Sequence, residues 1–434
     1  MKKQKTESKT VTLTRRIEIY IDEPDVEKRK DVYKLLSNYK YMTFKAANII
    51  VNKQYANFLK RSDLKNSGMS AEEVKNAMKE ILGTSNQNST YREISEKFPE
   101  LPSLTRTSLN AKVLKCFNAD MQGVLNGDRT IRNYKLGMPI PFNSSVDMFS
   151  VVGGEESSIL TYKFRYTKDV KFVLNFGKDK SGNRIILDSI LAGEYKLCDS
   201  EIIMKDKSDN YAIYLSLTFT MPKTIVKLDY EKYAATNLGM NCPLYLTTSE
   251  GHAQGIGHKE EFWNIRKQFQ IRASNLQRFL KTAKGGRGRS RKLKALSRLK
   301  EAEKGFAKTY NHKISKQLVM FCLKNGIGVI KTENLLGGSE TLNKEIILRN
   351  WGYYQLQSQI EYKASMYGIK VVVVSPQNIT NTCNCCKNID EKCVNLEKRV
   401  YVCNQQNCNN FNKEVDIDKN ASLNVLVSVP AEKK

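Results

Sequence analysis

The sequence lacks any apolar run long enough to span a lipid bilayer. Its first residues, Met1-Lys2-Lys3-Gln4-Lys5, are basic and no apolar segment follows them, so we expect neither a signal peptide nor a membrane anchor. We therefore expect a cytoplasmic protein whose cysteines are reduced. Histidine is scarce, and none of His252, His258 and His312 suggests a catalytic triad.

Acidic residues are also few relative to basic ones. The 434 residues include 45 Asp and Glu against 71 Lys and Arg, which gives a formal net charge of +26 and a pI near 9.5. So large a positive charge favours a polyanionic partner, and nucleic acid is the first candidate. An anionic membrane surface is the alternative, but the basic residues are spread over the whole chain. The length allows two to four domains.

Hydrophobic patterning in the first half of the chain predicts a small β-barrel interrupted by a helical insertion. Alternating, β-branched residues at 11–20 predict a strand, and apolar spacing typical of helices follows from about Pro24 to Asn126. Breaks are expected at 83–89 and 99–102. Further strands are predicted at 171–176, 184–187 and 211–219, and a linker at 222–233.

The second half has the pattern of an α/β domain, in which strands alternate with helices. The predicted elements are a strand pair at 233–249, a basic helical region at 260–325, a buried strand at 328–333, a helix at 348–367, a strand at 369–374 and a final helix at 416–429.

Six of the ten cysteines lie between Cys383 and Cys408. Cys383 and Cys386 form a Cys-x2-Cys pair, and Cys403 and Cys408 form a wider Cys-x4-Cys pair. Four thiolates in two short-range pairs suit tetrahedral, structural zinc, with 394–402 as the hairpin of a zinc ribbon. An iron–sulfur site or unligated thiols are the alternatives. The adjacent Cys385 can replace Cys386 in this pattern, and Cys408 is the least secure ligand.

A basic helical stretch carries ten Lys and Arg residues with no acidic residue among them, which fits phosphate contacts without sequence reading. A turn at 285–290 is expected to divide it into two arms. A solvated face is the alternative, although such a face normally mixes both charges. The ten residues are Arg278, Lys281, Lys284, Arg287, Arg289, Arg291, Lys292, Lys294, Arg298 and Lys300.

Five local motifs occur in an order that resembles the miniature type V CRISPR effectors and their TnpB ancestors, over roughly residues 127–429. One motif alone would be weak, and the ordered set carries the resemblance. The motifs are Arg129-Thr130-Ile131-Arg132-Asn133-Tyr134-Lys135 with Pro139-Ile140-Pro141-Phe142; Asn311-His312-Lys313-Ile314-Ser315-Lys316; Leu348-Arg349-Asn350-Trp351 with Ile360-Glu361-Tyr362-Lys363-Ala364; Gly368-Ile369-Lys370-Val371 with Pro376; and Asp416-Ile417-Asp418-Lys419-Asn420.

The resemblance implies a multidomain α+β protein. Its parts would be a wedge β-barrel (1–23 and 127–225) with a helical recognition-lobe insertion (24–126), then an RNase-H-like (RuvC) α/β domain (226–376 and 413–434) with an inserted zinc ribbon that binds target nucleic acid (377–412). It also implies a guide RNA that pairs with target double-stranded DNA. The smallest relatives bind one guide as an asymmetric homodimer, so a homodimer stays open.

Position 237 departs from this family. The resemblance implies three catalytic carboxylates that hold Mg²⁺, at the positions of Asn237, Glu333 and Asp418, with Asp418 fitting the third position better than Asp416. Asn237 is neutral, and its amide nitrogen cannot coordinate a metal ion. We therefore expect weak or absent Mg²⁺ at this degenerate site.

Three functional hypotheses follow. The first is a guide-RNA-directed, nuclease-inactive DNA-binding protein of the bacterial nucleoid that regulates transcription by blocking a promoter or by recruiting a sigma factor or RNA polymerase, as nuclease-dead relatives do. The second is an active, Mg-dependent RNA-guided DNA endonuclease. The third is a zinc-ribbon nucleic-acid binder that acts without a guide, or a structural partner of a transposase.

Overall fold

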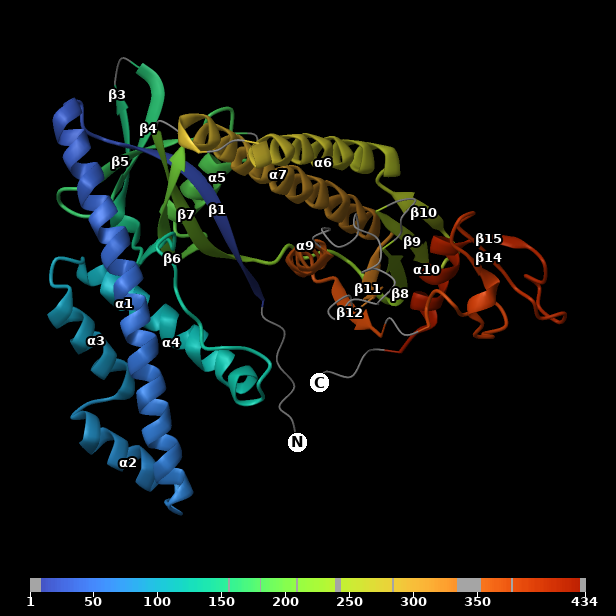
Figure 1. Cartoon of the computed structure of the whole chain (residues 1–434), viewed down its shortest axis with the longest axis horizontal. Coiled ribbons are helices and arrows are strands. Elements are labelled where there is room, and N and C mark those ends of the chain that lie inside the picture. The colour runs from blue at the N-terminus through green and yellow to red at the C-terminus, as the bar shows by residue number, and fades with distance from the viewer. Residues whose placement is uncertain are drawn as a thin grey trace. The chain divides into compact units, whose positions relative to one another are not determined.

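The computed structural model describes residues 9–154, 157–179, 181–207, 210–238, 243–282, 285–333, 353–375 and 378–429. The chain divides into two compact units, residues 1–222 and 223–434 (Figure 1). Within the described residues, no helix combines the length and the apolar character needed to cross a membrane. The finer division into named domains stays a prediction.

The first unit is built on a seven-stranded antiparallel sheet in the order β2-β6-β7-β1-β5-β4-β3. Long strands β1, β6 and β7 form its centre, and Ile17, Ile19, Leu215 and Phe219 on them are buried. Closure of this sheet into a barrel stays a prediction. The strands are β1 Thr10–Ile21, β2 Ile140–Phe142, β3 Phe149–Gly154, β4 Ser157–Arg165, β5 Lys171–Asn175, β6 Lys196–Lys207 and β7 Asn210–Pro222.

Four helices lie between β1 and β2 in the chain: α1 Val26–Asn66, α2 Ala71–Leu82, α3 Asn86–Lys97 and α4 Ser103–Leu125. Polar side chains fix where two of them begin. Asp25 accepts from the amides of Glu27 and Lys28 at the start of α1, and Ser70 and Glu73 form a capping box at the start of α2. The predicted helical insertion and both of its predicted breaks are therefore present.

One predicted strand is wrong. Residues 184–187 belong to a helix, α5 Asn183–Leu191, with Leu187 and Ile190 fully buried. Consecutive apolar residues in so short a run fit a strand or a buried helix equally well. Asp179 resolves the ambiguity, because its carboxylate accepts from the amides of Asn183 and Arg184 and so satisfies the first turn of the helix.

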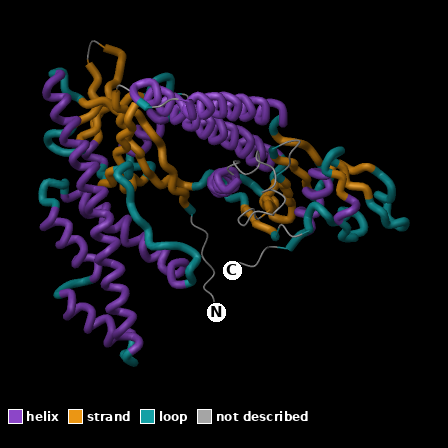
Figure 2. The backbone as a smooth tube through the Cα atoms, in the orientation of Figure 1, coloured by secondary structure: helices purple, strands orange, loops and turns teal. Residues whose placement is uncertain are grey.

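The second unit contains a five-stranded mixed sheet in the order β10-β9-β8-β11-β12, whose strands are labelled in Figure 1 and coloured orange in Figure 2. β8 runs antiparallel to β9 and parallel to β11, which is in turn parallel to β12. The strands are β8 Asp229–Asn237, β9 Leu244–Thr248, β10 Ala253–Ile256, β11 Ile327–Glu333 and β12 Lys370–Val374.

Two features of this sheet correct or explain the sequence interpretation. β8 begins at Asp229, which was expected to lie in the linker before the strand. Gly328 allows this long pairing, because a Cβ on it would lie 2.7 Å from the Asp229 carbonyl oxygen. The backbones of β8 and β11 thus approach closely at the bulge between Ile327 and Val329.

The helices of this unit are α6 Lys259–Thr282, α7 Gly286–Lys324, α9 Tyr353–Met366 and α10 Ile417–Val427. α6 and α7 form an antiparallel pair, held by Arg266–Glu303 and Lys313–Glu261 ion pairs and by Phe262 stacking on Phe306. The predicted arginine-bearing turn is shorter than expected. Arg287 and Arg289 lie in the first turns of α7, which begins at Gly286.

A small three-stranded sheet precedes α10: β13 Val394–Asn395, β14 Val400–Val402 and β15 Glu414–Asp416. β13 and β14 form the hairpin predicted for 394–402. β15 pairs with β14 and leads directly into α10, so Val400 lies opposite Asp416. This pairing places the hairpin beside the start of the last helix.

Candidate functional site

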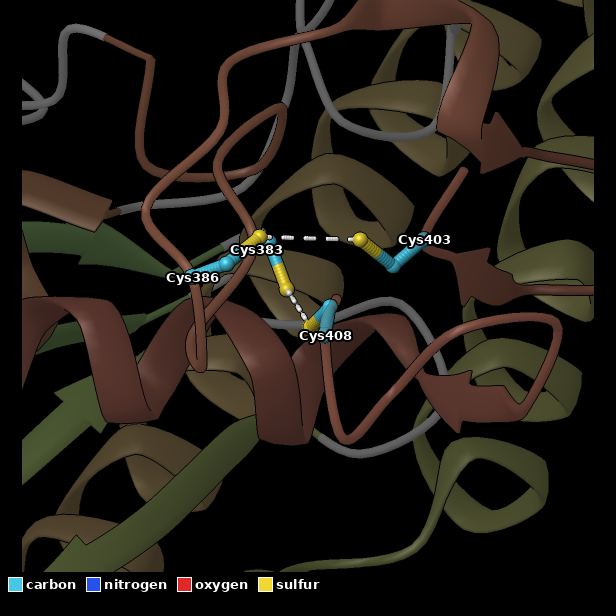
Figure 3. Close-up of side chains that lie close together, drawn as sticks. All are labelled: Cys383, Cys386, Cys403 and Cys408. Atoms are coloured by element: carbon cyan, nitrogen blue, oxygen red, sulfur yellow. Dashed lines mark hydrogen bonds between the residues drawn. The ribbon is translucent and has the colours of Figure 1, made fainter. Parts of the chain in front are cut away.

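The structure brings Cys383, Cys386, Cys403 and Cys408 together, with all four sulfur atoms within 4.8 Å of one another (Figure 3). The Sγ atoms of Cys383 and Cys408 are 3.7 Å apart, and those of Cys386 and Cys403 are 3.6 Å apart. Zn–S bonds of about 2.3 Å in a tetrahedron place sulfur atoms about 3.8 Å apart. The four sulfurs therefore have the spacing of a four-thiolate zinc site.

Two local features shape this cluster. After Cys383, the chain turns back so that the Cys383 amide donates to Asn388 and the Lys387 amide donates to Cys383, with Lys387 at φ +61°. The Asn410 amide donates to the Cys408 sulfur and lowers the pKa of that thiol to about 6. A low pKa favours the thiolate, which is the form that binds a metal ion.

The spare cysteines lie outside the cluster. Cys385 is exposed, and Cys393 is buried beside Tyr401, so the geometry favours Cys386 over Cys385 and includes Cys408. The residues present fit zinc. Bound there, the ion would cross-link two loops that bury few apolar side chains of their own.

Three polar residues expected from the sequence meet at one edge of the five-stranded sheet. Asn237 ends β8, Glu333 ends the neighbouring parallel strand β11, and Asp418 lies in the first turn of α10. All three are buried, with exposed fractions of 6%, 8% and 3%. The Asn237 side-chain amide donates to Asp418 Oδ1 at 3.4 Å. The expected triplet therefore forms one site.

The structure separates the two candidate aspartates. Asp416 is the N-cap of α10, where its carboxylate accepts from the Lys419 amide. Asp418 lies two residues further, in the first turn of α10, and faces Asn237. The residue that enters the site is thus Asp418, as the sequence interpretation preferred.

Burial changes the charge of this site. Removal from water and, to a smaller extent, the neighbouring Asp418 charge together raise the pKa of Glu333 to about 8. At neutral pH Glu333 is therefore mostly protonated. Asn237 is neutral at any pH, so Asp418 is the principal negative charge among the three.

The sequence interpretation missed one residue of this site, Arg399. Its guanidinium donates from Nη2 to Asp418 Oδ1 at 2.9 Å, and the side chains are 18% and 4% exposed. Arg399 lies in the β13–β14 hairpin, so it reaches the carboxylate from the cysteine-bearing segment. Its position between Lys398 and Val400 gives no sequence signal, because a basic residue in a hairpin turn is common on protein surfaces.

This set of side chains does not fit a pair of Mg²⁺ ions. Mg²⁺ prefers anionic oxygen ligands, and two-metal sites need several of them. Here a neutral amide stands at one of the three positions, and Asp418 already faces a guanidinium.

The basic residues lie on the paired helices α6 and α7. All the described members of the predicted set are exposed except Lys292, which is partly covered and lies 5.4 Å from the ring of the exposed Phe279. Lys284 lies outside the described residues. The helices thus present guanidinium and ammonium groups to solvent along one end of the pair, as phosphate contacts require.

The second unit thus combines a mixed sheet that carries polar residues at its strand ends with a cysteine-bearing ribbon and a final helix. Residues 353–425 match the family model described as Cas12f1-like, TNB domain, which covers α9, the ribbon and most of α10. The chain is similar to the miniature type V CRISPR effectors and TnpB proteins.

Several curated proteins of this group are similar to the chain in sequence. The CRISPR-associated endodeoxyribonuclease Cas12f1 of Sulfoacidibacillus thermotolerans is 29% identical over 358 residues, which cover 80% of this chain and 82% of that protein. The Cas12f1 of Syntrophomonas palmitatica is 27% identical, over 73% of this chain and 66% of that protein. A TnpB-like protein of Methanocaldococcus jannaschii is 30% identical over 38% of this chain and 54% of that protein.

Among solved structures, a Cas12f1–sgRNA–target DNA complex matches with a TM-score of 0.70. The match covers 96% of this chain and 99% of the matched chain at 17% sequence identity. It supports the multidomain α+β fold from end to end.

Proposed function

We propose that this protein is a guide-RNA-directed DNA-binding protein whose RuvC-like site does not cut. In this proposal the first unit provides the wedge and recognition lobe, and the second provides an RNase-H-like domain with its zinc ribbon. The observation that carries the proposal is the position of Asn237, which lies within hydrogen-bond distance of Asp418 and beside the strand that ends in Glu333.

Partners follow from the relatives and from the charge. Cas12f1 in the matched structure is bound to sgRNA and target DNA. A net charge of +26 and the exposed Arg and Lys side chains of α6 and α7 give this chain the surface that such partners need. Guide RNA and double-stranded DNA are the partners we propose.

Loss of one carboxylate should greatly lower the rate of DNA cleavage. A unit charge facing another at 4 Å is worth roughly 4 kcal/mol at an effective dielectric constant of 20, and a divalent ion doubles the interaction. Each ~1.4 kcal/mol of lost transition-state stabilisation lowers the rate tenfold. Asparagine at position 237 therefore predicts a cleavage rate several orders of magnitude below that of a protein with three carboxylates.

An active RNA-guided endonuclease is the second candidate, because the matched Cas12f relatives carry the name endodeoxyribonuclease. Glu333 and Asp418 are still in place to support it. The two candidates make the same prediction for binding and opposite predictions for cleavage, so one assay separates them.

The assay compares the native chain with Asn237→Asp. Protein is loaded with the RNA that co-purifies with it and incubated with matched duplex DNA and Mg²⁺ under single-turnover conditions. We expect tight binding without cleavage by the native chain, and at least a hundredfold faster cleavage by the variant. Native cleavage at the variant's rate would overturn the inactive site and favour the endonuclease.

Two controls make this test sharper. Glu231→Gln changes a carboxylate to an amide on the exposed part of β8, outside the site, and should alter neither binding nor cleavage. Asn237→Ala should remain inactive, which shows that the gain requires a carboxylate and not merely a change at position 237. Purification without a specific small RNA would count against guided recognition itself.

A protein that holds a DNA site without cutting it can block a promoter or bring transcription machinery to it. We propose transcriptional control as the outcome. A reporter gene whose promoter matches the guide should change its expression when the native chain is present, and Asn237→Asp should instead cause loss of the reporter plasmid. An unchanged reporter under saturating guide and protein would contradict this role.

A further inference from the structure

The loop that joins α4 to β2 carries two arginines that share one buried carboxylate. Asp120, near the end of α4, is 8% exposed. Arg132 donates to both oxygen atoms of this carboxylate, from Nε to Oδ2 at 2.7 Å and from Nη2 to Oδ1 at 3.2 Å. Arg129 donates from Nη1 to Oδ1 at 2.5 Å. The two guanidinium groups therefore meet at one carboxylate on the surface of α4.

The backbone of this loop is anchored on both sides of the arginines. Residues 126–139 are all described and form neither a helix nor a strand. The Arg129 amide donates to the Gly123 carbonyl oxygen at 3.2 Å. The Asn48 side chain, on α1, accepts from the Tyr134 amide at 2.9 Å and donates to the Tyr134 carbonyl oxygen at 3.1 Å. The segment that carries both arginines is thus fixed to two helices.

Gly123 gives Arg129 the room that this arrangement needs. A Cβ on Gly123 would lie 3.1 Å from Cγ and Cδ of Arg129, so the stem of the arginine lies directly against the helix backbone. Glycine inside a helix costs about 1 kcal/mol relative to alanine. Between the two arginines, Ile131 packs against the buried cluster that contains Phe117 and Met121. The helix is therefore intrinsically weaker at the point where the arginine crosses it.

Positive charge is in excess at this point of the first unit. The hydrogen bonds from Arg132 hold the pKa of Asp120 below its ordinary value, so the carboxylate is ionised at neutral pH. Two guanidinium groups against one carboxylate leave one unit of positive charge. The side chains of Arg129 and Arg132 are 54% and 47% exposed, and a guanidinium has five N–H donors. Each arginine can therefore contact a second anion while it stays paired with Asp120.

Phosphate is the anion that suits this arrangement. Guanidinium groups bind phosphate oxygens through pairs of parallel N–H···O bonds. A carboxylate that already holds the arginine side chains fixes their rotamers, so that less conformational entropy is lost when a ligand binds. The net charge of +26 favours a polyanion over an isolated anion.

We propose that Arg129 and Arg132, held by Asp120, form a clamp for the phosphodiester backbone of a nucleic acid. Asp120 is a positioning residue, because it contacts the two arginines and not the ligand. The clamp rests on the proposed binding of guide RNA and target DNA, and it assigns part of that binding to residues of the first unit. Both nucleic acids offer the same phosphodiester chemistry, so the experiment has one arm for each.

Binding by the full-length protein is measured at several salt concentrations. One arm uses the co-purifying RNA, and the other adds matched duplex DNA to the RNA-loaded protein. The Arg129→Gln, Arg132→Gln double variant should bind about tenfold or more weakly in at least one arm. Its plot of log Kd against log salt concentration should become shallower by about 1.8 for duplex DNA or about 1.4 for single-stranded RNA, as two lost phosphate contacts require. Unchanged affinity and slope in both arms would overturn the clamp and leave guided binding intact, whereas failure of the native chain to bind either nucleic acid would overturn both.

A matched control removes the same charge from the same unit. Arg61 on α1 and Arg92 on α3 are exposed and lie outside the clamp. The Arg61→Gln, Arg92→Gln double variant should change the affinity by less than about twofold and should keep most of the native salt dependence. Equal losses in the two double variants would mean that the total charge of the first unit matters and the clamp does not.

Asp120→Asn separates positioning from charge. This change removes a negative charge, so an effect of charge alone would tighten the binding of nucleic acid. If Asp120 positions the arginines, binding should instead weaken by about fivefold, in the same arm as for the arginine double variant. Tighter or unchanged binding by Asp120→Asn, with native thermal unfolding, would overturn the positioning role. The arginine variants test the clamp by themselves if Asp120→Asn does not fold.

Discussion

The cysteine cluster and the carboxylate site both lie against α10, but they differ in how their charges are balanced. The cluster keeps four sulfur atoms at the spacing of a zinc site, and the Asn410 amide favours the thiolate at Cys408. The carboxylate site contains an amide, a carboxyl that burial keeps protonated, and a carboxylate paired with Arg399. The cluster has the geometry to hold a metal ion, whereas the charges of the carboxylate site are largely balanced by side chains of the chain itself.

If the proposed function is right, the sheet-edge site has lost its chemistry while the cysteine cluster has kept its structural role. Four thiolates close together repel one another unless a cation is bound, so the cluster is a folding site for the ribbon. At the sheet edge, donors from within the chain already satisfy Asp418. The substitution at position 237 is restricted to that edge and leaves the cysteine cluster and the exposed basic residues of α6 and α7 in place.

The largest expected effect concerns the cysteine cluster. Cys403→Ser removes one of four zinc ligands, and structural zinc sites of this type contribute on the order of 10 kcal/mol to folding. We expect the ribbon to lose protection from hydrogen exchange over 394–416, while the five-stranded sheet stays protected. Mass spectrometry of the exchanged protein measures both regions at once.

Cys385→Ser is the matched control for that change. Cys385 is adjacent to a cluster member but is exposed and outside the cluster. Its substitution should leave zinc content at one ion per chain and ribbon protection unchanged. Loss of zinc in Cys385→Ser with retention in Cys386→Ser would reverse the assignment of the first pair.

The next largest effect is the pH dependence of stability that Glu333 causes. Its pKa is raised from 4.5 to about 8 in the folded protein, so the folded state binds a proton that the unfolded state releases between these values. Stability should therefore fall as pH rises from 5 to 8. At ~1.4 kcal/mol per pKa unit of difference, we expect this carboxyl to account for a loss of about 3–4 kcal/mol over that range.

Glu333→Gln should flatten that pH dependence, because the amide resembles the protonated carboxyl. The measurement is the free energy of unfolding by urea at several pH values, with the exposed Glu231→Gln as a control that should retain the native slope. If Glu333→Gln leaves the pH dependence of the free energy of unfolding unchanged, Glu333 is ionised in the folded protein. The carboxylate site would then carry a second negative charge and would not be close to neutral.

The smallest effect tests the link between the two sites. Asn424→Ala removes donors to the carbonyl oxygens of Ile379 and Thr382, which leaves two buried acceptors with one donor fewer. A cost of about 1–2 kcal/mol is expected, with zinc still bound. Asn395→Ala, in the exposed part of the hairpin, should cost less than half of that. Equal costs would mean that the amide contacts with α10 do not hold the ribbon.

Much of the second unit could be predicted from its sequence because its signals are local. The strands at 328–333 and 369–374 are β-branched runs bounded by glycine or serine, and both are present as β11 and β12. The Cys-x2-Cys pair and the position of Asp418 before Asn420 are also local patterns. The strand predicted at 184–187 was wrong because three consecutive apolar residues suit either a strand or a buried helix.

Sequence alone determined the basic charge, the alternation of strands and helices in the second unit, the cysteine pairs and the absence of a carboxylate at position 237, since each depends on residue type and on spacing along the chain. Only the tertiary structure decided that Asn237, Glu333 and Asp418 meet and that Arg399 joins them. These residues are up to 181 positions apart, and the parallel pairing of β8 with β11 and the pairing of β14 with β15 bring them together.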